Sequence, residues 1–371
     1  METFYLILIT LYVWLLWMMR RSWNRPDPPP NPTVKFHVAL LIPYRNETQH
    51  LPALMINLQK VIPSSVEIYF IDDWSEDDSR NIIEEFLKDN IHPNWRSLKN
   101  LGSGKKAALS TAIQYTGADI ILTTDVDCQL QEHWVRQMCQ PFEKASIHMV
   151  AGPVMTSFGA GFFAGFQQWD WASILLLTRF LFYRGQGLLC SGANLAYRKS
   201  AFLEVEGYYG NEAYASGDDE FLLKKVIHEY GQQAVIYLHR REVLVMTKPL
   251  NKWKEFIWQR VRWASKWKLH KSILHGFTAF LTYLQAFLQI GTFMLLWGND
   301  RSISVFVGFW VIKIGIEIYS LRTVLSSFHI YLPIYSFVLS SFLHPFYILF
   351  VGPLAIIGNY SWKGRKYISQ S

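Results

Sequence analysis

A buried strand that ends in two acids constrains the fold of this chain more than any other stretch. Residues 118–122 read ADIIL, and Thr123–Cys128, which follow directly, read TTDVDC. An apolar run that ends abruptly in acid is typical of a strand buried on both faces of a parallel sheet. Ligands gather beyond the carboxyl ends of such strands. We therefore expect an α/β sheet with a polar site at this edge.

The two acids of this stretch suggest what the polar site holds. Asp125 and Asp127 are two residues apart, so in an extended chain their side chains point to the same side. Two converging carboxylates repel unless a cation lies between them. Mg²⁺ or Mn²⁺ is typically held by one or two carboxylates together with substrate phosphates. The spacing favours a metal site at Asp125 and Asp127 that meets a diphosphate, and a solvated acidic turn is the alternative.

Long apolar segments near both ends of the chain indicate an integral protein of the inner or plasma membrane. Half of the 371 residues are hydrophobic (50%), and the net charge is +7. Because many Lys and Arg side chains flank the apolar segments, the positive charge favours membrane lipids as partners and argues against nucleic acid. Arg20 and Arg21 directly follow the first apolar run, which predicts that the next domain is cytoplasmic.

Shifts in composition divide the chain into five segments. Two candidate spans lie at 277–297 and 303–321. Lys313 and Glu317 are spaced i, i+4 in the second of these, so we expect them to pair inside a bundle. Residues 330–357 contain three prolines and could form one long span or a broken hairpin. The predicted segments are a transmembrane anchor (1–22), a proline-rich linker (23–33), a catalytic domain (34–250), an amphipathic interfacial helix (251–272) and a C-terminal transmembrane region with a basic tail (273–371).

Strands and helices alternate through the predicted catalytic domain, and this order predicts βαβ units and a parallel sheet. Residues 159–183 are expected to form a helix of this domain that could touch the membrane. A span is less favoured there because Gln167, Gln168 and Asp170 interrupt the apolar run. The expected strands are 34–43, 66–71, 98–100, 118–123, 149–156 and one within 188–199, with helices at 51–61, 79–90 and 107–115.

Two further polar stretches carry more than one interpretation. Gly102–Lys106 reads GSGKK, which lacks the spacing of a nucleotide-binding phosphate loop, and Lys106 stands where that loop needs Ser or Thr. Lys105 near a diphosphate is one interpretation, and a flexible helix start is the other. Asp218 and Asp219 begin a predicted helix, where acids also serve as simple caps.

Four polar motifs stand in a characteristic order along the chain: Asp72-Asp73, Asp125-Val126-Asp127, Asp218-Asp219, and Gln259, Arg262 and Trp263 in a QxxRW pattern. This series resembles the membrane-bound family 2 glycosyltransferases, the group with cellulose synthase, hyaluronan synthase and ceramide glucosyltransferase. The resemblance covers about Lys35 to Trp267 and the flanking spans. It implies an α/β fold of the GT-A (Rossmann-like) type, with one N-terminal and several C-terminal transmembrane helices. It also implies a donor that is usually a UDP-sugar.

The resemblance assigns roles residue by residue. Asp219 matches the catalytic base, and Asp218 stands where the family has Glu, so either carboxylate could act. The metal ligands would be Asp125 and Asp127. Acceptor contacts are implied for Gly192, Asn194 and Trp263. Donor contacts are expected for Pro43, Glu47, Asp72, Asp73, Lys105, Asp125, Gln259, Arg262 and Trp263.

The chemistry of sugar transfer needs residues of these types. Negative charge grows on the leaving diphosphate, and a divalent cation and an arginine such as Arg262 stabilise it. A carboxylate removes the proton of the attacking hydroxyl, and a single base opposite the leaving group gives inversion. We therefore expect an enzyme that transfers a sugar from a nucleotide-diphosphate sugar to a lipid-linked or saccharide acceptor. A processive polysaccharide synthase is the alternative, and a non-catalytic sugar-binding membrane protein is a further one.

Overall fold

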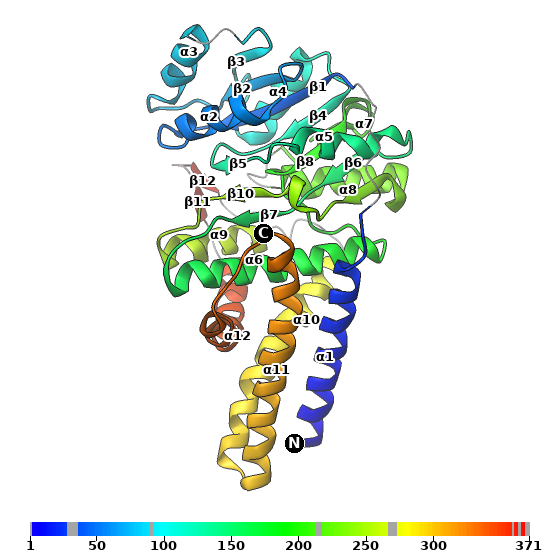
Figure 1. Cartoon of the computed structure of the whole chain (residues 1–371), viewed down its shortest axis with the longest axis vertical. Coiled ribbons are helices and arrows are strands. Elements are labelled where there is room, and N and C mark those ends of the chain that lie inside the picture. The colour runs from blue at the N-terminus through cyan, green and yellow to red at the C-terminus, as the bar shows by residue number, and fades with distance from the viewer. Residues whose placement is uncertain are drawn as a thin grey trace. The chain divides into compact units, whose positions relative to one another are not determined.

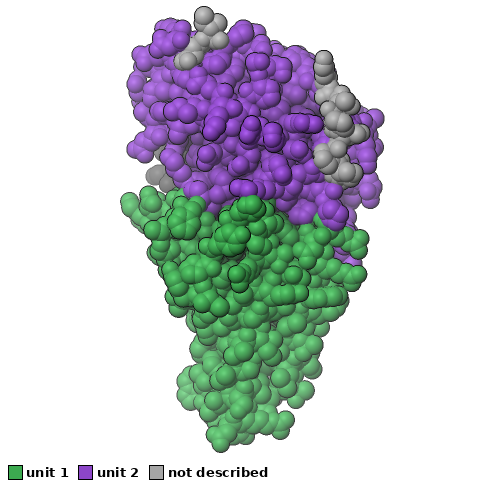
Figure 2. Space-filling model, viewed as in Figure 1, with its two compact units in different colours: residues 1–25, 158–180, 249–371 green, residues 26–157, 181–248 purple. Residues whose placement is uncertain are grey.

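The chain divides into two compact units, coloured separately in Figure 2. A computed structural model describes residues 2–27, 36–89, 92–212, 217–265, 273–357, 360–362 and 365–367. Unit 1 comprises Met1–Arg25, Phe158–Phe180 and Pro249–Ser371, and unit 2 comprises Pro26–Ser157 and Leu181–Lys248. Most of the predicted linker (28–33) and the end of the predicted interfacial helix (266–272) lie outside the described residues.

Unit 2 is built on a mixed seven-stranded sheet with the order β3-β2-β1-β4-β8-β6-β9 (Figure 1). The strands β3, β2, β1 and β4 are parallel to one another. By contrast, β8 is antiparallel to both β4 and β6. The strands are β1 (Val38–Tyr44), β2 (Glu67–Asp72), β3 (Trp95–Lys99), β4 (Ile120–Thr123), β6 (Met149–Ala151), β8 (Leu195–Arg198) and β9 (Val235–Tyr237).

The expectation of a parallel sheet is therefore wrong for β8 alone, because β6 runs in the same direction as β4 and pairs with β9 in parallel. Before β8 the chain runs through Phe158–Phe180, which belongs to unit 1. The helix α6 (Gly161–Tyr183) lies between β6 and β8 in the chain, and β8 nevertheless runs antiparallel to β6. The expected strand 149–156 is also divided at Gly152 and Pro153, and its second half enters another sheet. That sheet has the order β5-β10-β7, with β5 (Cys128–Gln129), β7 (Val154–Thr156) and β10 (Val245–Thr247).

Helices connect the parallel strands as the sequence predicts. Every residue of β1 and β4 is buried, as expected for strands covered on both faces. The helix α4 begins at Lys105, two residues before its predicted start, and this places Lys105 at the carboxyl edge of the sheet. The helices of unit 2 are α2 (Leu51–Val61), α3 (Ser79–Asp89), α4 (Lys105–Tyr115), α5 (Trp134–Cys139), α7 (Lys199–Glu204) and α8 (Asp218–Tyr230), with 3-10 turns η1 (Gln140–Glu143), η2 (Gln232–Ala234) and η3 (Arg241–Val243).

Unit 1 consists mainly of helices. Among the described residues, four helices are long and apolar enough to cross a membrane: Glu2–Trp23, Gly276–Trp297, Asp300–Ser327 and Ile334–Ile356. The last settles the open question about residues 330–357, because α12 is one helix with Pro345 and Pro353 inside it. The elements are α1 (Glu2–Trp23), α6 (Gly161–Tyr183, whose last residues belong to unit 2), α9 (Trp253–Ser265), α10 (Ile273–Gly291), η5 (Thr292–Trp297), α11 (Asp300–Ser327), α12 (Ile334–Ile357), β11 (Tyr360–Trp362) and β12 (Arg365–Tyr367).

Polar contacts join the apolar helices of unit 1. The predicted pairing of Lys313 with Glu317 is confirmed, with 2.7 Å between Nζ and Oε1. The hydroxyl of Tyr12 on α1 donates to Glu317 Oε1 at 2.5 Å, and Arg20 Nε donates to Thr323 Oγ1 at 2.9 Å. These contacts hold α1 and α11 side by side (Figure 1). The buried ion pair therefore lies in the interior of the bundle, where intramembrane charges are tolerated.

Candidate functional site

The acids after β2 fix the loops around the edge of the sheet. Asp72 ends β2, and its Oδ1 accepts a hydrogen bond from Ser75 N at 2.9 Å. Asp73 Oδ1 accepts from Asn100 Nδ2 and from Gly104 N, both at 2.8 Å. Gly104 has a φ of 90°, in the left-handed region that favours glycine. Asp73 therefore fixes the loop between β3 and α4, which positions Lys105 at the start of α4.

Lys105 connects two of the acidic motifs. Its Nζ lies 2.7 Å from Asp125 Oδ1, after β4, and 3.2 Å from Asp218 Oδ2, at the start of α8. Burial lowers the pKa of Lys105, but the nearby carboxylates of Asp125 and Asp218 more than offset burial and raise it well above its ordinary value. Lys105 therefore stays protonated, and it brings residues that are distant in sequence to one place.

Gly192 brings the start of α8 to the end of β4. Its N–H donates to Asp219 Oδ2 at 3.0 Å, and its carbonyl accepts from Thr123 Oγ1 at 2.7 Å. A Cβ at this position would lie 2.5 Å from Asp218 Oδ2 and 3.1 Å from Lys105 Nζ. Only glycine fits without displacing these groups. The second oxygen of Asp219 accepts from Glu220 N at 2.8 Å, so both of its oxygens have a fixed direction.

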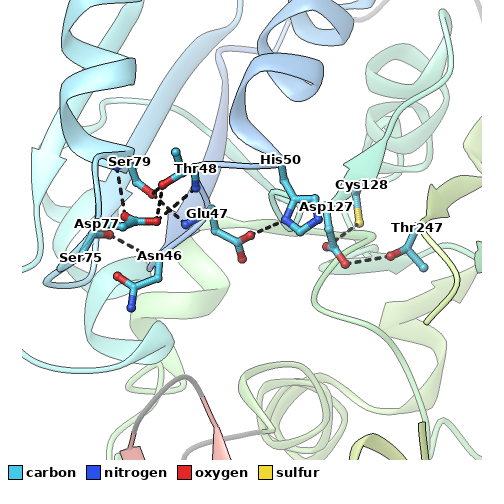
Figure 3. Close-up of polar contacts among 10 residues, drawn as sticks. All are labelled: Asn46, Glu47, Thr48, His50, Ser75, Asp77, Ser79, Asp127, Cys128 and Thr247. Atoms are coloured by element: carbon cyan, nitrogen blue, oxygen red, sulfur yellow. Dashed lines mark hydrogen bonds and ion pairs between the residues drawn. The ribbon is translucent and has the colours of Figure 1, made fainter. Parts of the chain in front are cut away.

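Asp127 faces a second group of polar side chains (Figure 3). Its Oδ2 accepts from Thr247 Oγ1 on β10 at 2.9 Å. Glu47 and His50, from the loop after β1, lie near it and contact each other at 2.7 Å between Oε2 and Nδ1. Burial, followed by the charge of Asp125, raises the pKa of Asp127 above its ordinary value. Sequence reasoning missed Thr247, for which no local signal exists, and His50, whose spacing of three residues from Glu47 could have indicated it.

The loop that carries Glu47 is held by the loop after β2. Glu47 N donates to Ser79 Oγ at 2.7 Å, and Asn46 N donates to Ser75 Oγ at 3.2 Å. Figure 3 shows these contacts on the side of Glu47 away from Asp127. Pro43 is buried within β1, where it pairs in register with Ile71 of β2. The backbone at Asn46 and Glu47 is thus held by the side chains of Ser75 and Ser79.

The pair Asp125 and Asp127 fits a divalent cation. Both supply carboxylate oxygens, which Mg²⁺ and Mn²⁺ prefer. Burial is the largest cause of the raised pKa of Asp127, and the negative charge of Asp125 adds to it. Within the described ranges, no group of three or more His, Cys, Asp and Glu could hold a metal ion. A cation here would need further ligands from water or substrate phosphate, as Mg²⁺ commonly does.

Asn194 has a structural role. Its side chain is 0% exposed. Nδ2 donates to the carbonyls of Pro153 and Val243, both at 2.7 Å, and Oδ1 accepts from Trp134 Nε1 at 2.9 Å. Because its amide is engaged inside the core, the expected acceptor contact of Asn194 is corrected to a packing role.

The QxxRW residues lie on α9 in unit 1. Gln259, Arg262 and Trp263 are spaced i, i+3, i+4, so they share one face of this helix. All three are half-buried. The acids and Lys105 lie in unit 2. The expected contacts of these three residues with donor and acceptor stay predictions.

Comparisons with known proteins agree on the class of the sheet domain. Residues 39–205 match the family described as Glycosyl transferase family 2. The chain is 32% identical over 108 residues to an undecaprenyl-phosphate 4-deoxy-4-formamido-L-arabinose transferase of Pseudomonas savastanoi pv. phaseolicola, covering 28% of this chain and 30% of that protein. A protein of the same name from Pseudomonas fluorescens is 30% identical over 95 residues, covering 25% of this chain and 28% of that protein. The matches thus span less than a third of these relatives.

A solved structure extends the likeness over almost the whole chain. The mannosyltransferase PcManGT from Pyrobaculum calidifontis, in complex with GDP-Man and Mn²⁺, superposes with a TM-score of 0.59 at 13% identity, covering 95% of this chain and 96% of that chain. At this identity the likeness establishes a shared fold, that of the GT-A glycosyltransferases. Residues 39–205, which carry Asp72, Asp73, Lys105, Asp125 and Asp127, therefore form a glycosyl transferase family 2 domain.

Proposed function

We propose that this protein is a membrane-bound inverting glycosyltransferase, with a UDP-sugar as donor and a lipid-linked or saccharide acceptor. The observation that carries the proposal is the bridge from Lys105 to Asp125 and Asp218, at 2.7 and 3.2 Å. It assembles a protonated amine, the acids after β4 and the acids of α8 at one edge of a nucleotide-sugar fold. The four apolar helices support a membrane-borne acceptor.

On the donor side, the proposed reaction breaks the bond between the sugar C1 and the diphosphate. A divalent cation held by Asp125 and Asp127 would neutralise charge on the leaving diphosphate. Lys105 is protonated and lies between Asp125 and Asp218, so it adds a fixed positive charge to the same region. Fixed charges of this kind need no reorganisation as the leaving group forms.

On the acceptor side, Asp219 is the proposed base. An attacking hydroxyl forms the new bond to C1, and its proton passes to a carboxylate oxygen of Asp219. Hydrogen bonds from Gly192 N and Glu220 N, at 3.0 and 2.8 Å, hold that carboxylate in one orientation. Attack opposite the leaving diphosphate inverts the configuration at C1, and no covalent nucleophile is needed.

The nature of the acceptor decides how much this base matters. The curated relatives are named as undecaprenyl-phosphate transferases. A phosphate acceptor is already ionised near neutral pH, so it attacks without a base, whereas a hydroxyl must lose its proton. Asp219→Asn should slow transfer to a hydroxyl about 10²–10⁴-fold and should leave transfer to a lipid phosphate nearly unchanged. The same variant thus identifies which acceptor class the protein uses.

A donor and acceptor screen tests the function as a whole. The full chain in lipid nanodiscs is incubated with UDP- and GDP-sugars, with Mg²⁺ or Mn²⁺ or with EDTA, and with dodecyl-chain phosphate or hydroxyl acceptors. We expect metal-dependent release of the nucleoside diphosphate and one added sugar per acceptor. A ladder of products would favour a processive synthase. Release from no donor would favour a non-catalytic sugar-binding protein.

The proposed orientation places unit 2 on the cytoplasmic face. It is supported by Arg20 and Arg21 at the end of α1, by the rule that positive charge stays inside. Cysteines introduced on exposed positions of unit 2, such as Lys60 on α2, should react with an impermeant maleimide only after the cells are opened. Labelling in intact cells would show instead that unit 2 lies on the outer face of the membrane.

A further inference from the structure

Gln167 and Asp170 are two of the polar side chains that interrupt the apolar helix α6, and the proposed reaction uses neither. Gln167 is 1% and Asp170 is 3% exposed. They are spaced i, i+3, so they lie on the same face of α6. A buried carboxylate and a buried amide in so apolar a helix need partners, because leaving them unpaired would be costly.

Gln167 fixes the segment that leads into α9. Its Nε2 donates to the carbonyl of Leu250, and its Oε1 accepts from the N–H of the same residue, both at 2.9 Å. Leu250 lies three residues before the first residue of α9. A side-chain amide that pairs with both backbone groups of one residue sets the position of that residue relative to α6.

Asp170 fixes the middle of α9. Its Oδ2 accepts from Arg260 Nε at 2.8 Å, and Arg260 Nη2 lies at the same distance. Arg260 is 4% exposed, so both members of the ion pair are buried. Arg260 is the second residue of the QxxRW pattern. Its side chain lies on the buried side of α9.

Arg260 in turn contacts two residues of the QxxRW pattern. Its Nη1 donates to Gln259 Oε1 at 2.5 Å. Its guanidinium carbon lies 4.2 Å from the ring centroid of Trp263, and it also stacks on Phe256 and Trp171 at 4.5 and 5.2 Å. The planar guanidinium can donate to a carboxylate and an amide while stacking on rings, which a lysine cannot do. Arg260 therefore links Asp170 to Gln259 and Trp263.

We propose that Asp170 is a positioning residue, which orients Gln259 and Trp263 for sugar transfer by holding Arg260. The proposal rests on the proposed function and on the donor contacts that the resemblance predicts for Gln259 and Trp263. The competing view is that the Asp170–Arg260 pair only ties α6 to α9 and that any pairing of charges would serve. The two views differ in what a swapped pair can do.

Four variants of the full chain in nanodiscs separate these views. Asp170→Asn removes the charge. Arg260→Lys keeps a cation beside Asp170 but loses the planar contacts with Gln259 and Trp263. The swap Asp170→Arg with Arg260→Asp keeps an ion pair but removes the guanidinium from α9. Glu255→Gln is the matched control, because Glu255 lies on α9, is exposed, and contacts only Lys252 at 3.6 Å among its recorded ion pairs within the described residues.

Hydrogen exchange of α9 is measured first, because it does not depend on activity. We expect residues 253–265 to exchange about tenfold faster in Asp170→Asn, with α10, α11 and unit 2 unchanged and with Glu255→Gln like the wild type. Unchanged exchange of α9 in Asp170→Asn would overturn the proposal. If the wild type transfers no sugar at all, the proposed function fails, while this measurement still decides whether Asp170 positions α9.

Transfer kinetics are measured second, with nucleotide binding as the internal reference. We expect Arg260→Lys and the swapped pair to lower kcat about 10–100-fold, as for other side chains that orient binding groups. Binding of free nucleoside diphosphate with Mn²⁺ should stay within about twofold, because the acids and Lys105 of unit 2 are untouched. A wild-type kcat in the swapped pair, or in Arg260→Lys, would overturn the proposal and show that Asp170 only holds α6 and α9 together.

Discussion

The ammonium group of Lys105 lies 2.7 Å from Asp125 Oδ1 and joins the loop before α4 to the acids after β4. The same group lies 3.2 Å from Asp218 Oδ2 at the start of α8. The ammonium group of Lys105 thereby brings together residues that are more than one hundred positions apart in the sequence. The charge of Lys105 holds the acids together, and in the proposed function it would also attract the diphosphate of the donor.

Replacing Lys105 by methionine should lower kcat/KM for sugar transfer about 100-fold or more. Removal of one preorganised charge from a site of this kind typically costs about that much, and the carboxylates of Asp125 and Asp218 would also be left to repel. Steady-state transfer assays measure the effect. The control is Lys60→Met, an exposed lysine on α2. A loss of less than about threefold in Lys105→Met would show that the bridge is dispensable.

Gly192→Ala should disable the site although it adds a single methyl group. The new Cβ would lie 2.5 Å from Asp218 Oδ2, so the carboxylate or the backbone must move. Such overpacking costs about 1–3 kcal/mol of stability. We expect a lower melting temperature and a loss of transfer. Gly117→Ala is the matched control, because the nearest described neighbour of its Cβ would be His37, at an ordinary contact distance of 3.7 Å. Equal activity in the two variants would contradict the described geometry.

Asp127→Asn should stabilise the protein without metal and remove its response to Mn²⁺. Burial and the charge of Asp125 raise the pKa of Asp127, so its ionised form costs stability when no cation is bound. In the wild type, Mn²⁺ at about 100 times its dissociation constant should add about 2.7 kcal/mol. Thermal unfolding with Mn²⁺ and with EDTA measures both effects. A variant that Mn²⁺ still stabilises as strongly as the wild type would remove Asp127 from the metal site.

Lys224 on α8 should make stability depend on pH in the alkaline range. Burial lowers the pKa of Lys224 to about 8, against a smaller opposing effect of Glu220. No hydrogen-bond partner of its Nζ is found in the described part of the chain. The folded chain therefore binds this proton more weakly than the unfolded chain does. Protonated Lys224 therefore destabilises the folded chain to its full extent below about pH 8. This destabilisation disappears as the pH rises towards the ordinary pKa of lysine.

Lys224→Met removes this cost, so the variant should be more stable than the wild type at pH 7. The difference between the two should shrink as the pH is raised to about 10. Melting temperatures of both proteins across this range give the result. A difference that stays constant with pH would mean that Lys224 has an ordinary pKa.

Local sequence patterns correctly predicted those elements whose structure depends on residues close by in the sequence. The apolar strands β1 and β4 are buried on both faces, and the spacing of Lys313 and Glu317 correctly predicted their pairing. The apolar run that ends abruptly at Asp125 and Asp127 correctly predicted that these acids follow a buried strand. In each case the chain within a few residues carries the whole signal.

The features that the sequence did not predict depend on contacts between distant segments. The antiparallel direction of β8 is set by its pairing with β4 and β6, which lie far from it in the sequence. Asn194 lies two residues after Gly192, but its partners Trp134 and Val243 lie 60 and 49 positions away. No local pattern distinguishes such a buried amide from one that binds a ligand.

The most direct test is transfer of a radiolabelled sugar by the full chain in nanodiscs, compared with Asp125→Asn. Asp125 is both the partner of Lys105 and a proposed metal ligand, so its charge is central to the site. We predict that the wild type forms a labelled, lipid-extractable product only with Mg²⁺ or Mn²⁺, and that Asp125→Asn lowers the rate at least about 100-fold. Product that forms equally well in EDTA and in Asp125→Asn would contradict the account.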